Sequence, residues 1–280
     1  MGFLAKIAFS GFLGIMGVVN CVEGVQQSIT GNMTSYLNAC SKAVEDSDYF
    51  RNFRSRHEYA SILGEWGHAN EYAHYFLTHA SEEALSQLEL FKRLDQYGSP
   101  STCNFPGLEG FSPINIRYMY IADHLARLFQ LPSHPKIGEI GAGFGGQCYI
   151  LSHRIPFSSY FIYDLPEAER LTEKILKLLS VDRVNLLLLE TPFPEDKIDL
   201  LISNYAFSEC GRETQLDYFD RIIRKADRGY MLFNQLRCMD TLSPDEFVQL
   251  LNDQGMNASI HQEPVNTHSD NVLIVWDRTR

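Results

Sequence analysis

The stretch Lys136-Ile137-Gly138-Glu139-Ile140-Gly141-Ala142-Gly143-Phe144-Gly145-Gly146-Gln147 combines a short apolar run with a cluster of glycines. An apolar run, a glycine-rich turn and the start of an amphipathic pattern together predict a strand, a tight turn and a helix N-terminus. Glycines at 141, 143 and 145 remove β-carbons from the turn, so a ligand can lie directly against the backbone. The unpaired N–H groups at the helix start favour a polar or anionic group. The stretch therefore predicts a ligand-binding turn in an α/β fold.

Short apolar strands alternate with amphipathic helices after Pro135. We expect strands at residues 137–140, 160–163, 184–189, 198–203, 230–233, 258–261 and 271–276, and helices at 145–153, 167–179, 214–225 and 243–252. This alternation predicts a parallel sheet with helices on both faces, and the last two strands, with no helix between them, predict an antiparallel pair. A seven-stranded sheet that ends in this way is typical of S-adenosylmethionine-dependent methyltransferases.

The region before this sheet has a helical pattern. Apolar residues recur at three- and four-residue spacing in stretches such as 71–94, and Ser112-Pro113 has the composition of a helix N-cap followed by proline. No convincing alternating strand stands out between residues 34 and 130, where 97–100 and 105–107 have loop compositions. We therefore expect a helical cap over residues 25–130 and a ligand-binding α/β domain over residues 131–280.

Residues 1–24 have the outline of a targeting segment. Lys6 precedes a mostly apolar run from Ile7 to Val19, and Val22 and Gly24 occupy the −3 and −1 positions of a cleavage site. A buried or amphipathic N-terminal helix is the other interpretation, and the run is short for a membrane span. If residues 1–24 are a true signal, we expect a secretory or membrane-anchored protein, with this segment as its only contact with the membrane. If they form a buried or amphipathic helix, we expect a cytoplasmic protein.

The composition restricts the partners and the metal chemistry. A chain of 280 residues, 45% of them hydrophobic, is long enough to bury a sizeable core. Its formal net charge is −11, and no lysine- or arginine-rich run is present. Proteins that track nucleic-acid phosphates usually carry the opposite charge, so we expect a small-molecule or glycan acceptor and no nucleic acid. The six cysteines form no C-x-x-C pair, which disfavours a zinc site and a dense disulfide framework.

Two carboxylates accompany the glycine turn. Gly141, Gly143 and Gly146 match G-x-G-x-x-G, a spacing that also fits a dinucleotide-binding fold. Glu139 stands where that fold usually has an apolar side chain, and a carboxylate there suits a cationic ligand that carries an ammonium and a sulfonium. Asp164, after the second strand, could accept hydrogen bonds from ribose hydroxyls of either cofactor or cap the next helix. With the terminal strand pair, Glu139 favours S-adenosylmethionine over NAD, and a purely structural role is its alternative.

The fourth predicted strand ends in a polar cluster, Ser203-Asn204-Tyr205-Ala206-Phe207-Ser208-Glu209. Reacting groups in open α/β sheets collect at the carboxyl ends of strands near the reversal of strand order. Glu209 is the candidate general base, with a capping or salt-bridge carboxylate as its alternative, and Tyr205 is the candidate that orients an acceptor hydroxyl. Asn204 is expected to fix the loop or contact the cofactor. Asn204 and Asn234 stand where a magnesium site would need carboxylates, so no metal is predicted.

Four stretches of the chain resemble the sugar O-methyltransferase family of the S-adenosylmethionine-dependent superfamily. They are Ser112-Pro113-Ile114-Asn115-Ile116-Arg117-Tyr118, the glycine turn from Glu139 to Gln147, Tyr163-Asp164-Leu165-Pro166-Glu167-Ala168, and the Ser203–Glu209 cluster. The resemblance covers residues 110–235, and the last stretch is its most particular part. It implies methyl transfer to a hydroxyl of a sugar, with Glu139, Gly141, Gly143 and Asp164 binding the cofactor.

These features predict an S-adenosylmethionine-dependent O-methyltransferase with a seven-stranded Rossmann-like sheet, residues 131–280, and an N-terminal helical cap. The expected cofactor contacts are Glu139, Gly141, Ala142, Gly143, Gly145, Asp164 and Asn204, and the expected catalytic residues are Glu209 and Tyr205. The alternatives are a module that binds the cofactor without transfer, an NAD-dependent oxidoreductase, and transfer to a protein or lipid acceptor.

Overall fold

The computed structural model describes residues 23–191, 197–234 and 240–278. Most of the predicted targeting segment, residues 1–24, lies outside the described residues. None of the helices in the described ranges is long and apolar enough to cross a membrane.

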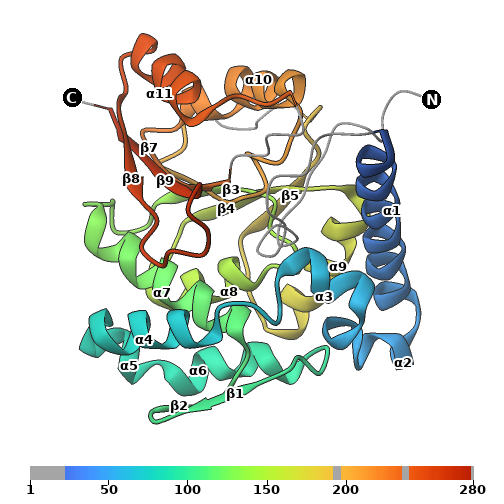
Figure 1. Cartoon of the computed structure of the whole chain (residues 1–280). Coiled ribbons are helices and arrows are strands. Elements are labelled where there is room, and N and C mark those ends of the chain that lie inside the picture. The colour runs from blue at the N-terminus through green and yellow to red at the C-terminus, as the bar shows by residue number, and fades with distance from the viewer. Residues whose placement is uncertain (1–22, 192–196, 235–239, 279–280) are drawn as a thin grey trace.

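A seven-stranded sheet forms the centre of the molecule (Figure 1). Its strands are β3 (Lys136–Ile140), β4 (Ser159–Tyr163), β5 (Val184–Leu187), β6 (Leu200–Asn204), β7 (Arg228–Phe233), β8 (Asn257–Gln262) and β9 (Val272–Asp277). They lie in the order β5-β4-β3-β6-β7-β9-β8. Strand β9 is antiparallel to both of its neighbours, and the other pairs are parallel. The strand order reverses between β3 and β6, and both the parallel sheet and its antiparallel edge are confirmed.

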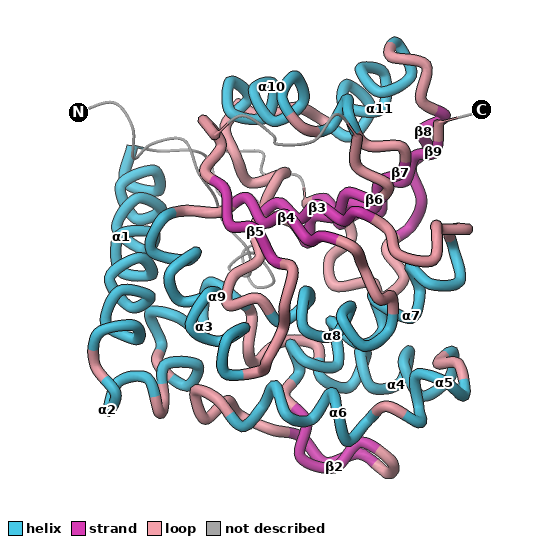
Figure 2. Tube along the Cα trace, turned by 180° about the vertical axis from the view of Figure 1, so that it is seen from behind, coloured by secondary structure: helices cyan, strands magenta, loops and turns pink. Residues whose placement is uncertain are grey.

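Helices cover both faces of the sheet (Figure 2). One layer contains α7 (Pro113–Leu128), α8 (Gly146–Arg154) and α9 (Pro166–Leu178), and the other contains α10 (Arg212–Arg221) and α11 (Pro244–Asp253). Because side chains alternate along a strand, each strand supplies both layers. In β4, Tyr160 and Ile162 belong to the apolar cluster under the first layer, and Phe161 and Tyr163 to the cluster under the second. Burial on both faces accounts for the unbroken apolar runs of the parallel strands.

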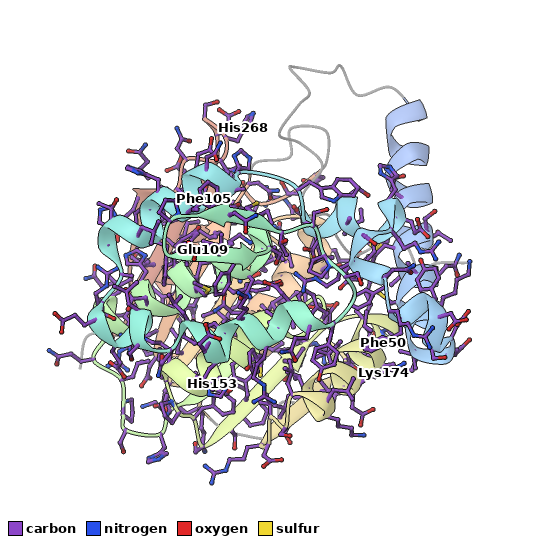
Figure 3. All side chains as sticks on the ribbon, turned by 90° about the horizontal axis from the view of Figure 1, so that it is seen from below. Phe50, Phe105, Glu109, His153, Lys174 and His268 are labelled. Carbon is purple, nitrogen blue, oxygen red and sulfur yellow. The ribbon has the colours of Figure 1, made fainter. Side chains whose placement is uncertain are left out.

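The N-terminal helices extend the first layer. They are α1 (Glu23–Glu45), α2 (Ser47–Phe50), α3 (His57–Leu63), α4 (Ala69–His79), α5 (Glu82–Ser86) and α6 (Leu88–Lys92). Helix α1 packs along α9 and α3, and α4 packs on α7. Lys174 of α9 donates hydrogen bonds to the Ala43 and Val44 carbonyls at the end of α1, and its amine lies 4.1 Å from the centre of the Phe50 ring (Figure 3). One continuous apolar cluster joins these helices to the sheet.

A hairpin interrupts the helical region. Strands β1 (Cys103–Phe105) and β2 (Leu108–Phe111) pair antiparallel about a turn at Pro106 and Gly107. The prediction that residues 34–130 contain no strand is therefore wrong at this point. Strands of three and four residues are too short to show the alternation that reveals a strand in a sequence.

Several predicted elements have different bounds in the structure, among them the strands expected at 184–189 and 230–233, which are Val184–Leu187 and Arg228–Phe233. Strand β6 starts at Leu200 rather than at residue 198, because Ile198 forms only an isolated bridge with Ala226. The helix expected at residues 214–225 ends at Arg221 and is followed by a separate 3₁₀ turn, Ile223–Lys225.

A buried arginine connects the N-terminal helices to the start of α7 and to the glycine turn. Arg54 is fully buried and forms a two-pronged ion pair with Glu65, at 2.6 and 3.0 Å. A second ion pair joins it to Asp95 at 3.0 Å, and it donates to the hydroxyl of Ser112, the N-cap of α7, at 2.8 Å. Its guanidinium carbon lies 4.5 Å from the centre of the Phe144 ring in the turn. This cluster fixes the helical region against the site.

Candidate active site

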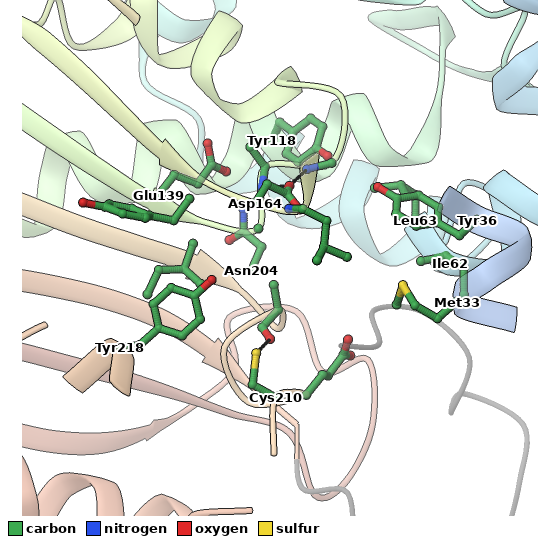
Figure 4. A pocket seen from close by; sticks show the side chains of 18 of the residues that line it. Met33, Tyr36, Ile62, Leu63, Tyr118, Glu139, Asp164, Asn204, Cys210 and Tyr218 are labelled. Atoms are coloured by element: carbon green, nitrogen blue, oxygen red, sulfur yellow. Dashed lines mark hydrogen bonds between the residues drawn. The ribbon is translucent and has the colours of Figure 1, made fainter. Parts of the chain in front are cut away.

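A cavity opens where β3, β4 and β6 end, next to the reversal of strand order. The space between its walls, counted together with its open mouth, is about 700 Å³. The sheet side is lined by Glu139 to Gly143, Tyr163 to Leu165, Asn204, Ala206, Glu209, Cys210 and Tyr218, and the helical side by Met33, Tyr36, Ile62, Leu63, Arg117 and Tyr118. Figure 4 shows Met33 and Leu63 across the cavity from Glu139. The N-terminal helices therefore form one wall of the site.

The glycine turn approaches the end of β6 very closely. Gly141 has a φ of +76°, and a Cβ built on it would lie 2.1 Å from the Cβ of Ala206. A side chain at 141 would therefore be strained and would also collide with the neighbouring loop. Ala142 and Gly143 line the cavity, and their contact with a cofactor stays a prediction. Gly145 does not line the cavity: it precedes α8 with a φ of +83° and faces Leu176 of α9, so its predicted cofactor contact is corrected to a role in shaping the turn.

Glu139 is a buried carboxyl group at the inner end of the cavity. Its side chain is 1% exposed and accepts a hydrogen bond of 2.8 Å from the Tyr160 hydroxyl. Burial raises the pKa of Glu139 to about 8, although the Tyr160 hydrogen bond acts in the opposite direction. Glu139 is therefore mostly protonated at pH 7, and a cation in the cavity would favour its ionised form. The sequence interpretation missed Tyr160. The strand register places Tyr160 opposite Ile137, so Tyr160 is a diagonal neighbour of Glu139 on the adjacent strand.

Asp164 connects β4 to the glycine turn. Its Oδ2 accepts hydrogen bonds from the Ala142 and Gly143 amides at 2.8 and 3.1 Å, and its Oδ1 accepts one from Leu165 at 2.8 Å. Burial raises its pKa to about 6. The N-cap of α9 is Leu165, so Asp164 does not have the alternative role of capping that helix. A carboxylate has about four acceptor positions, and a ligand hydroxyl can use the one that these three bonds leave.

Asn204 ends β6 and lines the cavity beside Glu139. Its Nδ2 donates to Gln147 Oε1 at 3.3 Å, and Gln147 Nε2 donates to the Tyr118 carbonyl at 3.2 Å. Its Oδ1 is buried and has no hydrogen-bond partner in the part of the chain that the structure describes. Unpaired buried acceptors are uncommon, so this atom points to a ligand that donates a hydrogen bond.

Glu209 lies in the loop after β6 and lines the cavity with 1% of its surface exposed. Its Oε1 accepts a hydrogen bond of 2.6 Å from Asn234 Nδ2. Ser208 in turn holds Asn234 in place. The Ser208 hydroxyl donates to Asn234 Oδ1 and accepts a hydrogen bond of 3.1 Å from the backbone N–H of Asn234. The structure therefore brings Glu209 to the cavity, and it adds Asn234 and Ser208 as the residues that orient it.

Tyr205 does not line the cavity. It has a φ of +73°, and its hydroxyl donates to Glu263 and lies 3.2 Å from the Thr267 hydroxyl, in the segment between β8 and β9. The predicted role of Tyr205 in orienting an acceptor is therefore corrected to a structural contact.

Within residues 23–191, 197–234 and 240–278, no three His, Cys, Asp or Glu side chains come together in a way that could hold a metal ion. The expectation of metal-independent chemistry stays a prediction.

The strand order, the glycine turn and the cavity at the switch point define a seven-stranded Rossmann-like α/β fold with one antiparallel strand, as predicted. No family model and no curated protein matches the chain.

Solved structures of methyltransferases are similar to a little more than half of this chain. An S-adenosylmethionine-dependent methyltransferase from Aquifex aeolicus is 14% identical over 56% of this chain and 89% of its own, with a TM-score of 0.44. An rRNA methylase from Streptococcus thermophilus is 16% identical over 58% and 96%, with a TM-score of 0.44. A Streptococcus mutans protein described as a methyltransferase, in complex with SAH, is 17% identical over 57% and 96%, with a TM-score of 0.43. This likeness concerns the fold.

Proposed function

We propose that the protein is an S-adenosylmethionine-dependent O-methyltransferase that acts on a hydroxyl of a sugar or glycan. The observation that carries the proposal is the meeting of Glu139, Asp164 and Glu209 around one cavity at the switch point. Each of the three carboxyl groups comes from the end of a different strand or the loop after it, where open α/β sheets bind their ligands.

The residues of the cavity fit the cofactor. The buried Glu139 and the unpaired Oδ1 of Asn204 suit an ammonium group, and Asp164 can accept from a ribose hydroxyl. The absence of a β-carbon at Gly141 lets a ligand lie against the turn. Met33 and Leu63 give the opposite wall an apolar surface. When bound, S-adenosylmethionine supplies a methyl group that its sulfonium has already activated.

The acceptor side is assigned to Glu209. Its carboxylate, oriented by Asn234, would hold the acceptor hydroxyl and take its proton as the oxygen attacks. Because the methyl group is already activated, alignment of the two reactants contributes most of the acceleration. The likeness of the Ser203–Glu209 stretch to the sugar O-methyltransferase family supports a sugar. The net charge of −11 favours a neutral acceptor over a nucleic acid.

Calorimetry with S-adenosylmethionine and with NAD tests the cofactor. We expect binding of the first and none of the second, and the opposite result would favour an oxidoreductase. A mass-shift screen over a glycan panel, with RNA, protein and lipid samples included, then tests the acceptor. Cofactor binding without transfer to any sample would favour a binding module.

Binding of S-adenosylmethionine at pH 7 is expected to release nearly one proton per protein. Glu139 has a pKa of about 8, so most molecules carry the proton before binding, and the ligand's positive charges favour its loss. Calorimetry in buffers of different ionisation enthalpy measures the proton release directly. The Glu139→Gln variant should release almost none and bind roughly tenfold more weakly, since one charge-assisted contact is lost. Unchanged proton release in this variant would remove Glu139 from the cofactor site.

A further inference from the structure

Arg117 is the one Lys or Arg among the described residues that line the cavity. It belongs to the Ser112–Tyr118 stretch, lies on α7 and is 5% exposed. None of the ion pairs among the described residues involves Arg117, and its Nε is buried without a hydrogen-bond partner. A guanidinium cannot lose its charge by deprotonation in a protein, so a buried one needs other compensation.

The surroundings of Arg117 supply only partial compensation. The rings of Tyr118 and Tyr205 each lie 5.7 Å from its guanidinium carbon, and the Tyr72 hydroxyl also interacts with it. Cation–π contacts attract a guanidinium but do not neutralise its charge, because an aromatic ring has no net charge. The buried carboxylates Glu65 and Glu263 interact with Arg117 electrostatically, but their hydrogen bonds are made with Arg54 and with Tyr205 and Thr267. The cavity therefore presents a desolvated cation that suits an anion.

The remaining polar groups of the cavity identify that anion. Glu139 and the unpaired Oδ1 of Asn204 line the same cavity as Arg117 and suit an ammonium. An ammonium and a carboxylate on one carbon are the amino-acid end of S-adenosylmethionine. We propose that Arg117 binds the α-carboxylate of S-adenosylmethionine while Glu139 and Asn204 face its ammonium. This assignment rests on the proposed function.

An anionic acceptor is the competing occupant of Arg117. The carboxylates of Asp164 and Glu209 line the same cavity and would repel a free anion, and Glu139 adds a third negative charge when it ionises. The cofactor brings its carboxylate together with two positive charges, an ammonium and a sulfonium, so its net charge suits this cavity. The donor is therefore the better match.

The test compares S-adenosylmethionine with decarboxylated S-adenosylmethionine, which lacks only the carboxylate. We expect Arg117→Met to weaken the affinity for S-adenosylmethionine on the order of 100-fold and the affinity for the decarboxylated form by less than about threefold. Arg117→Lys, which keeps the charge, should recover part of the loss. Arg127→Met is the matched control, because Arg127 is on the same helix with its side chain 42% exposed, and it should leave both affinities unchanged.

Wild-type protein tests the proposal without any variant, since it should bind S-adenosylmethionine far more tightly than the decarboxylated form. Equal affinities for the two ligands, or equal losses of both in Arg117→Met, would overturn the assignment. An unchanged S-adenosylmethionine affinity in Arg117→Met, together with a raised KM for the acceptor, would also overturn it and would mean that Arg117 binds an anionic acceptor. Wild-type protein that binds neither ligand would instead contradict the proposed function itself.

Discussion

Replacing Arg54 by alanine is expected to lower the free energy of unfolding by about 3–5 kcal/mol. The substitution leaves the carboxylates of Glu65 and Asp95 buried without their cation, and burial already raises the pKa of Glu65 against the effect of Arg54. It also removes the hydrogen bond to Ser112 at the start of α7 and the contact with Phe144 in the glycine turn. Urea unfolding measures the loss, and cofactor affinity should fall with it because the turn is no longer held.

Arg51→Ala is the matched control, three residues earlier in the chain. Arg51 pairs with Asp48 on the surface, where the two side chains are 73% and 80% exposed. Exposed pairs of this kind contribute between zero and about 1 kcal/mol. If Arg54→Ala cost no more than Arg51→Ala, the buried cluster would not hold the helical region against the sheet.

The sheet could be predicted because local pattern and tertiary environment agree in it. Apolar runs such as 137–140 and 160–163 are buried on both faces, and proline and glycine mark their ends. The glycine turn and Asp164 followed from their spacing, because the carboxyl ends of neighbouring parallel strands always lie at the same edge. This edge brought Glu139, Asn204 and Glu209 together, as expected.

The residues that were missed or misplaced depend on contacts between distant segments. Tyr205 follows Asn204 directly, but its side chain lies outside the cavity lining and bonds to Glu263, which is 58 residues further along the chain. Arg54 meets partners that are 11 to 58 residues away, so its role has no local signal. Arg117 belongs to the Ser112–Tyr118 stretch, but its position in the cavity follows from how α7 packs beside the sheet.

Glu209→Gln is expected to lower kcat about 100-fold while the dissociation constant of S-adenosylmethionine changes by less than about threefold. Glutamine keeps the size of the side chain and can still contact Asn234, but it cannot take the acceptor proton. The loss lies at the low end for a general base, because the sulfonium has already activated the methyl group and alignment is preserved. Single-turnover transfer to the acceptor found in the glycan screen, together with calorimetry of the cofactor, measures the two quantities separately.

Glu263→Gln distinguishes a catalytic carboxylate from a buried structural one. Glu263 is 2% exposed, as buried as Glu209, but its partners are Tyr205 and Thr267, outside the cavity lining. We expect the kcat of Glu263→Gln, expressed per folded protein, to stay within about threefold of wild type, because Glu263 does not line the cavity. The contradicting outcome is that Glu209→Gln loses turnover and cofactor affinity together and that Glu263→Gln loses both to the same extent. Both carboxylates would then have only a structural role, and another group would accept the proton.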